Sequence, residues 1–344
     1  MKRFVCVVIL CFVIGAVFVS GCERETVSSD PTSQAGPSTD VAEDEGATED
    51  VVATLPEEDY EMDARVLFLY PGDRVNYPIT FSGKKDKPDL TSFRWVSSDP
   101  DVAEVDEEGR ILGLHKGSAL ISCDALPGED AVCVNVVNSF GTGPSWDLDV
   151  LTGPDQLRTY RNYAQGAYDY DAHDDYLAMH GCAVCCATTI IRAWYPEEDW
   201  TPDRVMDELE SEASPEDYEK NYAKSVRRQM PLTLKGISRV FTLKDIPHTY
   251  VTEFDEKTLI EDLTGYLKDG KPIVFEAGNG GYHMLLLLGV MPNGDFVLSN
   301  SVGMMRVNAV PPEKVKKRLF SCTKEPVKSY FAGRKTAGGY IVVE

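Results

Sequence analysis

The sequence predicts a multidomain protein in which an all-β sandwich is followed by an α+β domain. Two patterns predict this order. Residues 62–138 contain short alternating strands separated by turn sequences, whereas residues 161–344 begin with amphipathic helices and continue with strands. A third observation concerns the N-terminus, where a basic start and an apolar run predict that both domains are exported.

The first 22 residues have the layout of a secretory signal peptide. Two basic residues precede the apolar run VCVVILCFVIGAVFV, which has an ordinary length for a signal sequence. The run ends in VSGC, which resembles the lipobox of bacterial lipoproteins. The resemblance implies cleavage before Cys22, lipidation of its thiol, and anchoring of the protein to the outer face of a bacterial membrane. The alternatives are an ordinary signal peptide and a retained membrane anchor.

An acidic segment, residues 23–61, separates this start from the first folded domain. It holds thirteen Asp or Glu residues against one Arg, with Ser, Thr, Pro and Gly between them. Such a composition buries too little apolar surface to fold, so we predict a disordered tether that charge repulsion extends. The whole chain has a formal net charge of −22, and no basic cluster is predicted to offer a phosphate-binding face. The composition therefore argues against nucleic acid as a partner.

Residues 62–138 are predicted to form the all-β domain. The segment FRWVSSDPDVAEVDEEGRILGLHKGSALISCDA shows short strands separated by the turn sequences SSDPD, DEEG and HKG. Strands at this spacing are typical of a two-sheet sandwich. Trp95 and the alternating Val and Ile residues are expected on the inward face, and the glycines are expected in the tight turns.

This segment also resembles the bacterial Ig-like domain, group 2. The resemblance rests on Trp95, Ser97, Ser98, Asp99, Val102, Ala103, Val105, Gly109, Ile111, Gly113, Lys116, Gly117, Ala119 and Ile121. It implies an Ig-like sandwich that serves as a spacer, or that binds carbohydrate or protein at its surface. We favour the spacer.

Two cysteines of this domain, Cys123 and Cys133, flank the loop sequence DALPGEDAV. If this loop is a hairpin centred near Gly128, the two cysteines lie opposite each other on neighbouring strands. An exported protein can form a disulfide at such a position. A reduced and buried pair is the alternative, and both interpretations are structural.

The α+β domain is expected at residues 161–344, after a linker at residues 139–160 that is polar and shows little periodicity. Apolar residues at helical spacing in CCATTIIRAWYP predict a buried helix that ends before Pro196. Further amphipathic helices follow, and then the strands KPIVFEA, GYHMLLLLGVM, GDFVLSNS and GYIVVE. The sequence PNGD joins the middle two as a hairpin turn. Helices followed by a mainly antiparallel sheet are an α+β pattern.

One set of residues in this domain has the chemistry of a nucleophilic active site. Cys182 begins the buried helix, where the helix dipole and free backbone N–H groups favour the reactive thiolate. His283 starts a very apolar strand, and the next strand ends in Asn300 and Ser301, which could reach its imidazole. A thiol, an imidazole and an amide in this order match the logic of a papain-type site. His283 would hold the thiolate as an ion pair, and Asn300 would orient the ring.

The segments GCAVCCATTIIRAWYP and LKDGKPIVFEAGNGGYHMLLLLGVMPNGDFVLSNS resemble two sequence blocks of the papain-like relatives of bacteriocin-leader (double-glycine) peptidases. The resemblance covers roughly residues 155–310 and implies a papain-like cysteine peptidase fold. It assigns the nucleophile to Cys182, the base to His283 and the orienting residue to Asn300. An upstream Gln often stabilises the oxyanion in this family, which makes Gln165 the candidate, together with the backbone N–H of Cys182.

The cysteines near the helix start have two other interpretations. A zinc site would use His180, Cys182, Cys185 and Cys186, but a second pair of closely spaced ligands is missing and Cys322 is the only distant thiol in this domain. A thioredoxin-like redox pair would join Cys182 to Cys185, but the strand that should precede such a pair is absent. We therefore predict no metal and no cofactor, and expect Cys185 and Cys186 to be buried packing residues.

The sequence as a whole predicts a lipid-anchored, extracytoplasmic cysteine peptidase that acts on a peptide, protein or cell-wall substrate. The alternative is a catalytically degenerate papain-like domain that binds a partner at the cell surface. The two differ in geometry. In an enzyme the Cys182 sulfur lies within roughly 4 Å of an imidazole nitrogen of His283, with Asn300 on the far side of the ring.

Overall fold

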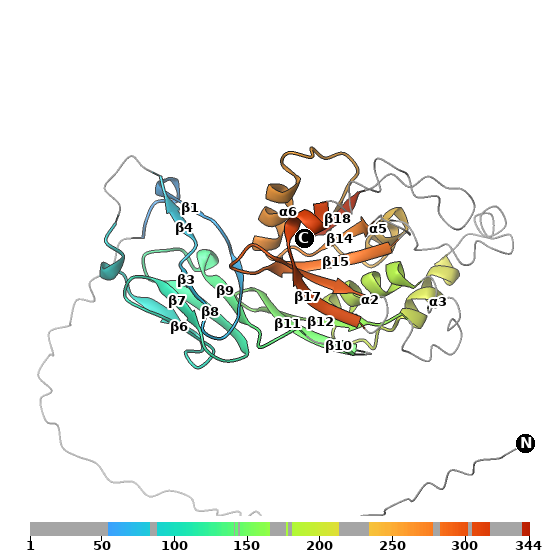
Figure 1. The fold of residues 1–344 in the computed structure, drawn as a ribbon, viewed down its shortest axis with the longest axis horizontal. Coiled ribbons are helices and arrows are strands. Elements are labelled where there is room, and N and C mark those ends of the chain that lie inside the picture. Colours follow the sequence, from blue (N-terminus) through green and yellow to red (C-terminus); the bar gives the residue numbers. More distant parts are fainter. Residues whose placement is uncertain are drawn as a thin grey trace, which may run out of the picture. The chain divides into compact units, whose positions relative to one another are not determined.

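The computed structural model of the chain (Figure 1) describes residues 54–82, 88–140, 142–143, 145–165, 177, 181–212, 234–277, 283–301, 305–316 and 339–344. The predicted signal peptide and lipobox with Cys22, most of the acidic tether, and Cys322 lie outside these residues. Within them, no helix is long and apolar enough to cross a membrane. The residues from Val51 to Glu344 form one compact unit.

The N-terminal part of this unit is rich in short strands, as the sequence predicted. The strands are β1 (Tyr60–Met62), β2 (Val66–Leu69), β3 (Arg74–Asn76), β4 (Ile79–Phe81), β5 (Trp95–Ser97), β6 (Ala103–Val105), β7 (Arg110–Gly113), β8 (Gly117–Cys123) and β9 (Val132–Val136). They form a four-stranded sheet in the order β2-β9-β8-β5, a three-stranded sheet β3-β7-β6 and the pair β1-β4. The single-turn helix η1 (Glu57–Asp59) precedes β1, η2 (Leu90–Ser92) lies between β4 and β5, and η3 (Gly128–Asp130) lies between β8 and β9.

This part begins within the segment that was expected to be tether. The backbone N–H of Leu55 donates to the carbonyl of Ala125 at 2.8 Å, and Tyr60 is buried in the core. The Tyr60 hydroxyl donates to Asp130 at 2.5 Å. Composition did not reveal this start, because Tyr60 stands between acidic residues and Leu55 follows only the short apolar stretch VVA.

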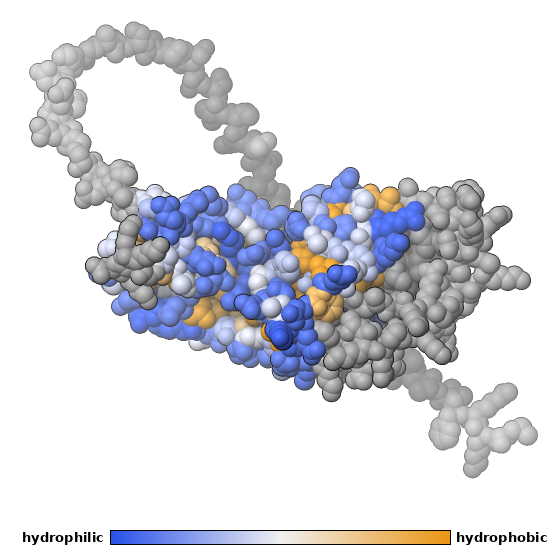
Figure 2. Space-filling model, turned by 90° about the horizontal axis from the view of Figure 1, so that it is seen from above, coloured by the Kyte–Doolittle hydropathy of each residue, from blue (hydrophilic) through white to orange (hydrophobic). Residues whose placement is uncertain are grey.

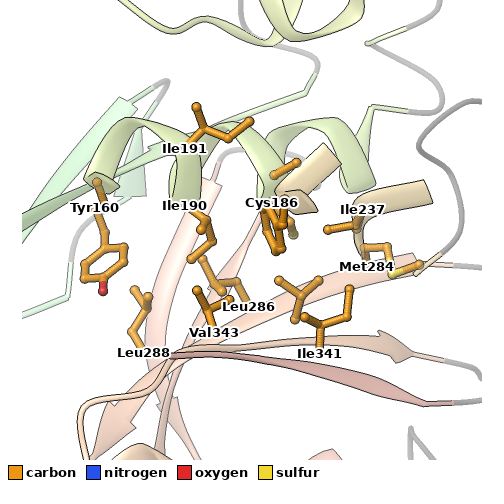
Figure 3. Close-up of a cluster of buried hydrophobic side chains, with 14 of the residues drawn as sticks. Tyr160, Cys186, Ile190, Ile191, Ile237, Met284, Leu286, Leu288, Ile341 and Val343 are labelled. Carbon is orange, nitrogen blue, oxygen red and sulfur yellow. The ribbon is translucent and has the colours of Figure 1, made fainter. Parts of the chain in front are cut away.

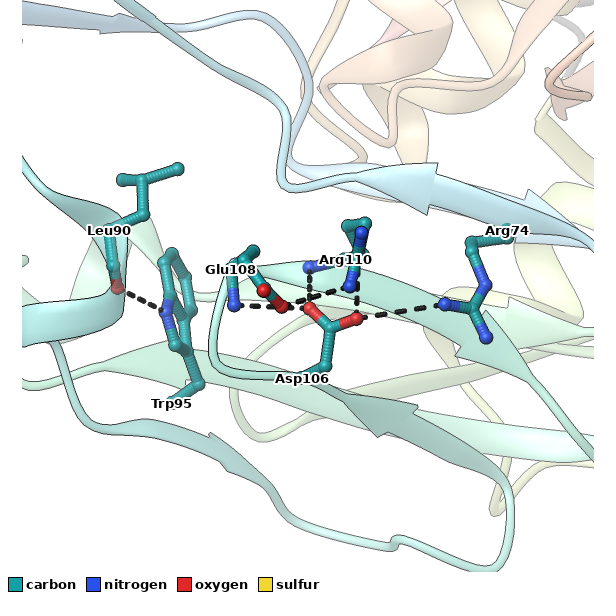
Figure 4. Close-up of polar contacts among 6 residues, drawn as sticks. All are labelled: Arg74, Leu90, Trp95, Asp106, Glu108 and Arg110. Atoms are coloured by element: carbon teal, nitrogen blue, oxygen red, sulfur yellow. Dashed lines mark hydrogen bonds and ion pairs between the residues drawn. The ribbon is translucent and has the colours of Figure 1, made fainter.

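The tight turn between β6 and β7 shows why the turn glycine is needed. The Asp106 carboxylate accepts from the backbone N–H groups of Glu108 and Arg110 and pairs with the Arg110 and Arg74 guanidinium groups (Figure 4). Gly109 has a φ of +72°, and a Cβ there would lie 2.8 Å from the Trp95 ring. Glycine is therefore required both by the backbone conformation and by the neighbouring indole.

Of the two interpretations of Cys123 and Cys133, the structure has the reduced one, since both thiols are free and buried. In the register of β8 and β9, Cys133 lies opposite Leu120 and not opposite Cys123. Side chains alternate along a strand, so Cys123 and Cys133 point to opposite faces of the sheet. The two cysteines accordingly belong to different hydrophobic cores.

Residues 139–160, expected to be a linker, contribute most of a β-hairpin. Its strands are β11 (Ser145–Gly153) and β12 (Gln156–Tyr163), which pair antiparallel. Leu148, Val150 and Tyr160 are buried, while Asp147 and Asp149 bond Arg161 and Thr159 across the pair. The alternation of apolar and polar residues is that of a half-buried strand, and the many charged residues masked it in the sequence.

The C-terminal part is built on a seven-stranded sheet in the order β10-β17-β16-β15-β14-β18-β13, with every neighbouring pair antiparallel. The strands are β10 (Thr142–Gly143), β13 (His248–Val251), β14 (Ile273–Ala277), β15 (His283–Val290), β16 (Phe296–Asn300), β17 (Met305–Val310) and β18 (Tyr340–Val343). The helices are α2 (Cys182–Trp194), α3 (Pro202–Glu212), α5 (Leu234–Leu243) and α6 (Leu259–Lys268). The predicted order of helices before an antiparallel sheet is present, except that β10 precedes the helices and β13 lies between α5 and α6.

Helices cover both faces of this sheet. One face packs against α2 and α5 in a single hydrophobic core, and the other packs against α6. Figure 3 shows Cys186 and Ile190 of α2 facing Leu286 of β15 and Val343 of β18. Figure 2 shows that polar residues cover most of the coloured surface on the face it presents. Among the described residues, the exposed large apolar side chains are Val96, Leu157 and Leu243.

The β-rich part and the α+β part share buried contacts. Phe68 of β2 packs so closely on β15 that a Cβ at Gly289 would lie 2.1 Å from its ring. Asn135 of β9, 1% exposed, donates to the carbonyl of Leu151 at 3.2 Å and accepts from the Leu151 N–H at 2.7 Å. These contacts are those of a shared core, whereas a spacer would be joined by a solvated linker.

We expect Phe68→Ala to lower the free energy of unfolding by about 3–5 kcal/mol, because it leaves a cavity between the two parts. Gly289→Ala should cost about 1–3 kcal/mol in the wild-type background, since its methyl group overlaps the Phe68 ring. The same methyl group should be tolerated when Phe68 is already Ala. Urea unfolding followed by circular dichroism measures all three variants.

The control for this cycle is Val96→Ala, which changes a side chain that is 42% exposed. It should alter the free energy of unfolding by no more than about 0.5 kcal/mol. Strictly additive effects of Phe68→Ala and Gly289→Ala would show that the ring and the glycine do not contact each other in solution.

Candidate active site

Cys182 is the first residue of α2, and the glycine before it shapes this start. The Gly181 N–H donates to the carbonyl of Leu177 at 2.9 Å, and a Cβ at Gly181 would lie 2.4 Å from that oxygen. The Gly181 carbonyl in turn accepts from the N–H of Cys185 at 2.8 Å, which opens the helical hydrogen-bond pattern. The sequence GC therefore fixes both the turn and the position of the thiol.

The Cys182 thiol is buried, and its electrostatic setting differs from the expected one. Burial raises the pKa of Cys182 to about 11, although hydrogen bonds from the backbone N–H groups of Met284, Ala183 and Cys182 lower it. The helix start thus acts in the expected direction, but the cost of removing a thiolate from water outweighs it. Burial thus disfavours the thiolate form of Cys182.

His283 is the first residue of β15, and its ring is held by the end of β16. The Nε2 atom lies 2.7 Å from the Oδ1 atom of Asn300. An amide oxygen can only accept, so Nε2 carries the hydrogen and Nδ1 is the basic nitrogen of the neutral ring. Met284, the next residue of the strand, provides one of the N–H groups that bond the Cys182 sulfur. The thiol therefore lies beside the peptide bond that joins His283 to Met284.

Gln165 follows β12 and is fixed by the residue after Asn300. The Ser301 hydroxyl donates to Gln165 Oε1 at 3.1 Å, and the Gln165 backbone N–H donates to the Ser301 carbonyl at 2.9 Å. Both side chains are buried. The sequence placed Ser301 within reach of the imidazole, whereas in the structure its hydroxyl bonds Gln165. All four predicted site residues are thus joined by one chain of contacts that runs through β15 and β16.

The neighbouring thiols are packing residues within α2. Cys185 and Cys186 are buried, and burial raises the pKa of both. Cys186 belongs to the core between α2 and the sheet. Among the described residues, no group of three His, Cys, Asp or Glu side chains is arranged to hold a metal ion. His180, the remaining ligand of the zinc interpretation, lies outside these residues.

Comparison with known proteins gives two family matches. Residues 158–318 match the Peptidase_C39 like family, and residues 77–133 match the bacterial Ig-like domain (group 2). The chain therefore combines a region similar to bacterial Ig-like domains with a region similar to the Peptidase_C39 like family. The first match spans the contacts that join Gln165, Cys182, His283 and Asn300. No curated protein matches the sequence.

The hydrogen bond between His283 and Asn300 predicts a specific effect on the ring. Asn300→Asp should raise the imidazole pKa of His283 by about 1–3 units, because a carboxylate 2.7 Å from Nε2 favours the charged ring. Asn300→Ala should produce no such rise. Titration of the ring carbon signals by NMR measures the pKa, with the exposed His115 as an internal reference. Equal pKa values in the two variants would contradict this contact.

Proposed function

We propose that the C-terminal domain hydrolyses amide bonds, with Cys182 as nucleophile, His283 as general base and acid, and Asn300 as the residue that orients the ring. The observation that carries this proposal is the 2.7 Å contact between His283 Nε2 and Asn300 Oδ1. With Nε2 bound to Asn300, Nδ1 is the basic nitrogen of the ring. The backbone N–H of the next residue, Met284, bonds the Cys182 sulfur. The match to the Peptidase_C39 like family supports the same chemistry.

The reaction would proceed through an acyl-enzyme. His283 Nδ1 takes the proton of the Cys182 thiol while the sulfur attacks the amide carbonyl carbon. The tetrahedral intermediate collapses, the C–N bond breaks, and the imidazolium gives its proton to the leaving amine. His283 then removes a proton from water, which attacks the thioester. Collapse of this second intermediate releases the carboxylic acid and returns the proton to the thiolate.

A negative oxygen forms in both intermediates and needs hydrogen-bond donors. The backbone N–H of Cys182 at the start of α2 is one donor, and the Gln165 side-chain amide is the other. Ser301 holds Gln165 through two hydrogen bonds. Donors that are fixed before the reaction stabilise the intermediate without reorganising.

The raised pKa of Cys182 bears on the first step. A thiol with a pKa of about 11 is not a free thiolate at pH 7, so its proton must leave during the attack. His283 supplies the acceptor. We therefore propose base-assisted attack from a neutral pair, where the sequence had suggested a stored ion pair.

The proposal extends to the place of action. The predicted lipobox at Cys22 would anchor the protein by a lipid to the outer face of a bacterial membrane. The substrate would then be a peptide, a protein or a cell-wall component outside the cytoplasm.

Alkylation with iodoacetamide tests the pair directly. At pH 7, Cys182 should react at least about tenfold faster in the wild type than in His283→Ala, because only the wild type has a base beside the thiol. In His283→Ala the rate should rise about tenfold per pH unit from pH 7 to 10, since the thiolate fraction grows in this way below a pKa of about 11. The wild-type profile should be flatter. Peptide mass mapping assigns the label to Cys182.

Two variants control this experiment. Cys182→Ala should remove the fast label, and His115→Ala should leave it unchanged, because that ring is exposed and bonds the carbonyl of Asp101 instead. Identical rates and slopes in the wild type and His283→Ala would contradict the enzyme proposal. That result would favour a papain-like domain that binds a partner without catalysis.

A further inference from the structure

Three successive residues at the end of β16 connect different parts of the candidate site. Asn300 reaches His283, whereas the residues on either side of it reach the end of β12. Ser299 donates to the Asn162 side chain, and Ser301 donates to Gln165. The arrangement follows from strand geometry, because residues 299 and 301 face one side of a strand and residue 300 faces the other.

The contact between Ser301 and Gln165 fixes the direction of an amide group. Gln165 is 8% exposed and Ser301 is 5% exposed, so bulk water does not compete for their hydrogen bonds. The Ser301 hydroxyl donates to Oε1 at 3.1 Å, and the backbone N–H of Gln165 donates to the Ser301 carbonyl at 2.9 Å. With Oε1 engaged by a donor, the NH2 group of the planar amide must point the other way.

We propose that Ser301 is a positioning residue for the oxyanion site: its hydroxyl holds the Gln165 amide so that Nε2 donates to the oxyanion. This inference rests on the proposed amide hydrolysis. Loss of the hydroxyl removes the donor that holds Oε1, which favours rotation of the amide by half a turn about its last side-chain bond. Its oxygen would then face the developing negative charge, and the stabilisation would turn into repulsion.

The test compares two reactions of the same thiol in the full-length protein. p-Nitrophenyl acetate acylates Cys182 through a tetrahedral oxyanion, whereas iodoacetamide alkylates it by direct displacement and forms no oxyanion. The ratio of the two rate constants therefore reports the oxyanion site and cancels changes in thiol reactivity. Stopped-flow release of p-nitrophenolate gives the acylation rate, and mass mapping confirms acetylation at Cys182.

Ser301→Ala should lower the acylation-to-alkylation ratio by about tenfold, and Gln165→Ala by about a hundredfold, which is typical for loss of one oxyanion donor. Ser301→Ala should have no further effect in the Gln165→Ala background, because the serine acts only through the glutamine. Ser301→Thr keeps the hydroxyl and should restore the ratio. Gln165→Glu should behave like Gln165→Ala or worse, since a carboxylate offers no donor.

The matched control is Ser299→Ala, which removes a buried hydroxyl from the same face of the same strand end. The Ser299 hydroxyl bonds Asn162 and not Gln165, so the acylation-to-alkylation ratio should stay within about twofold of the wild-type value. An unchanged ratio in Ser301→Ala would overturn this inference while leaving the proposed hydrolysis intact. The inference would also be overturned if Ser301→Ala lowered the acylation-to-alkylation ratio by the same factor in the Gln165→Ala background. If Cys182 of the wild type is not acylated at all, the proposed function fails, and this inference fails with it.

Discussion

The burial of α2 is the constraint on which the rest of the C-terminal domain depends. Eleven of its thirteen residues are buried, between the sheet, the β11–β12 hairpin, α3 and α5. Its buried hydroxyls are satisfied within the helix, since Thr188 and Thr189 donate to carbonyls one turn earlier. A helix enclosed in this way cannot shift without opening the core. Cys182 at its start is therefore fixed relative to β15.

The same burial sets the chemistry of the thiol. Removing Cys182 from water raises its pKa, and the hydrogen bond from Met284 only partly compensates. A neutral thiol needs a base, and His283 stands one residue before Met284 in the same strand. Rigid packing thus determines where the Cys182 thiol lies and disfavours its thiolate form at rest. The proposed reaction follows from that combination, because the proton must move to the imidazole during the attack.

The Ig-like region takes part in this framework. Phe68 packs against Gly289 in β15, the strand that begins with His283, and Asn135 bonds the backbone of β11. The sequence favoured a spacer for this region, because a group 2 Ig-like resemblance says nothing about what the domain touches. Buried contacts at β15 and β11 make it a structural partner of the domain that holds the candidate site.

The sequence by itself determined the periodic features: the helix that starts at Cys182, the apolar strand after His283, and the strand that ends at Asn300. These features need only a local pattern of apolar and polar residues. Tertiary structure decided the pairing of distant elements. It placed Cys123 and Cys133 on opposite faces of a sheet and paired Ser301 with Gln165. Strand register and desolvation depend on what packs against a residue, and no local pattern records that.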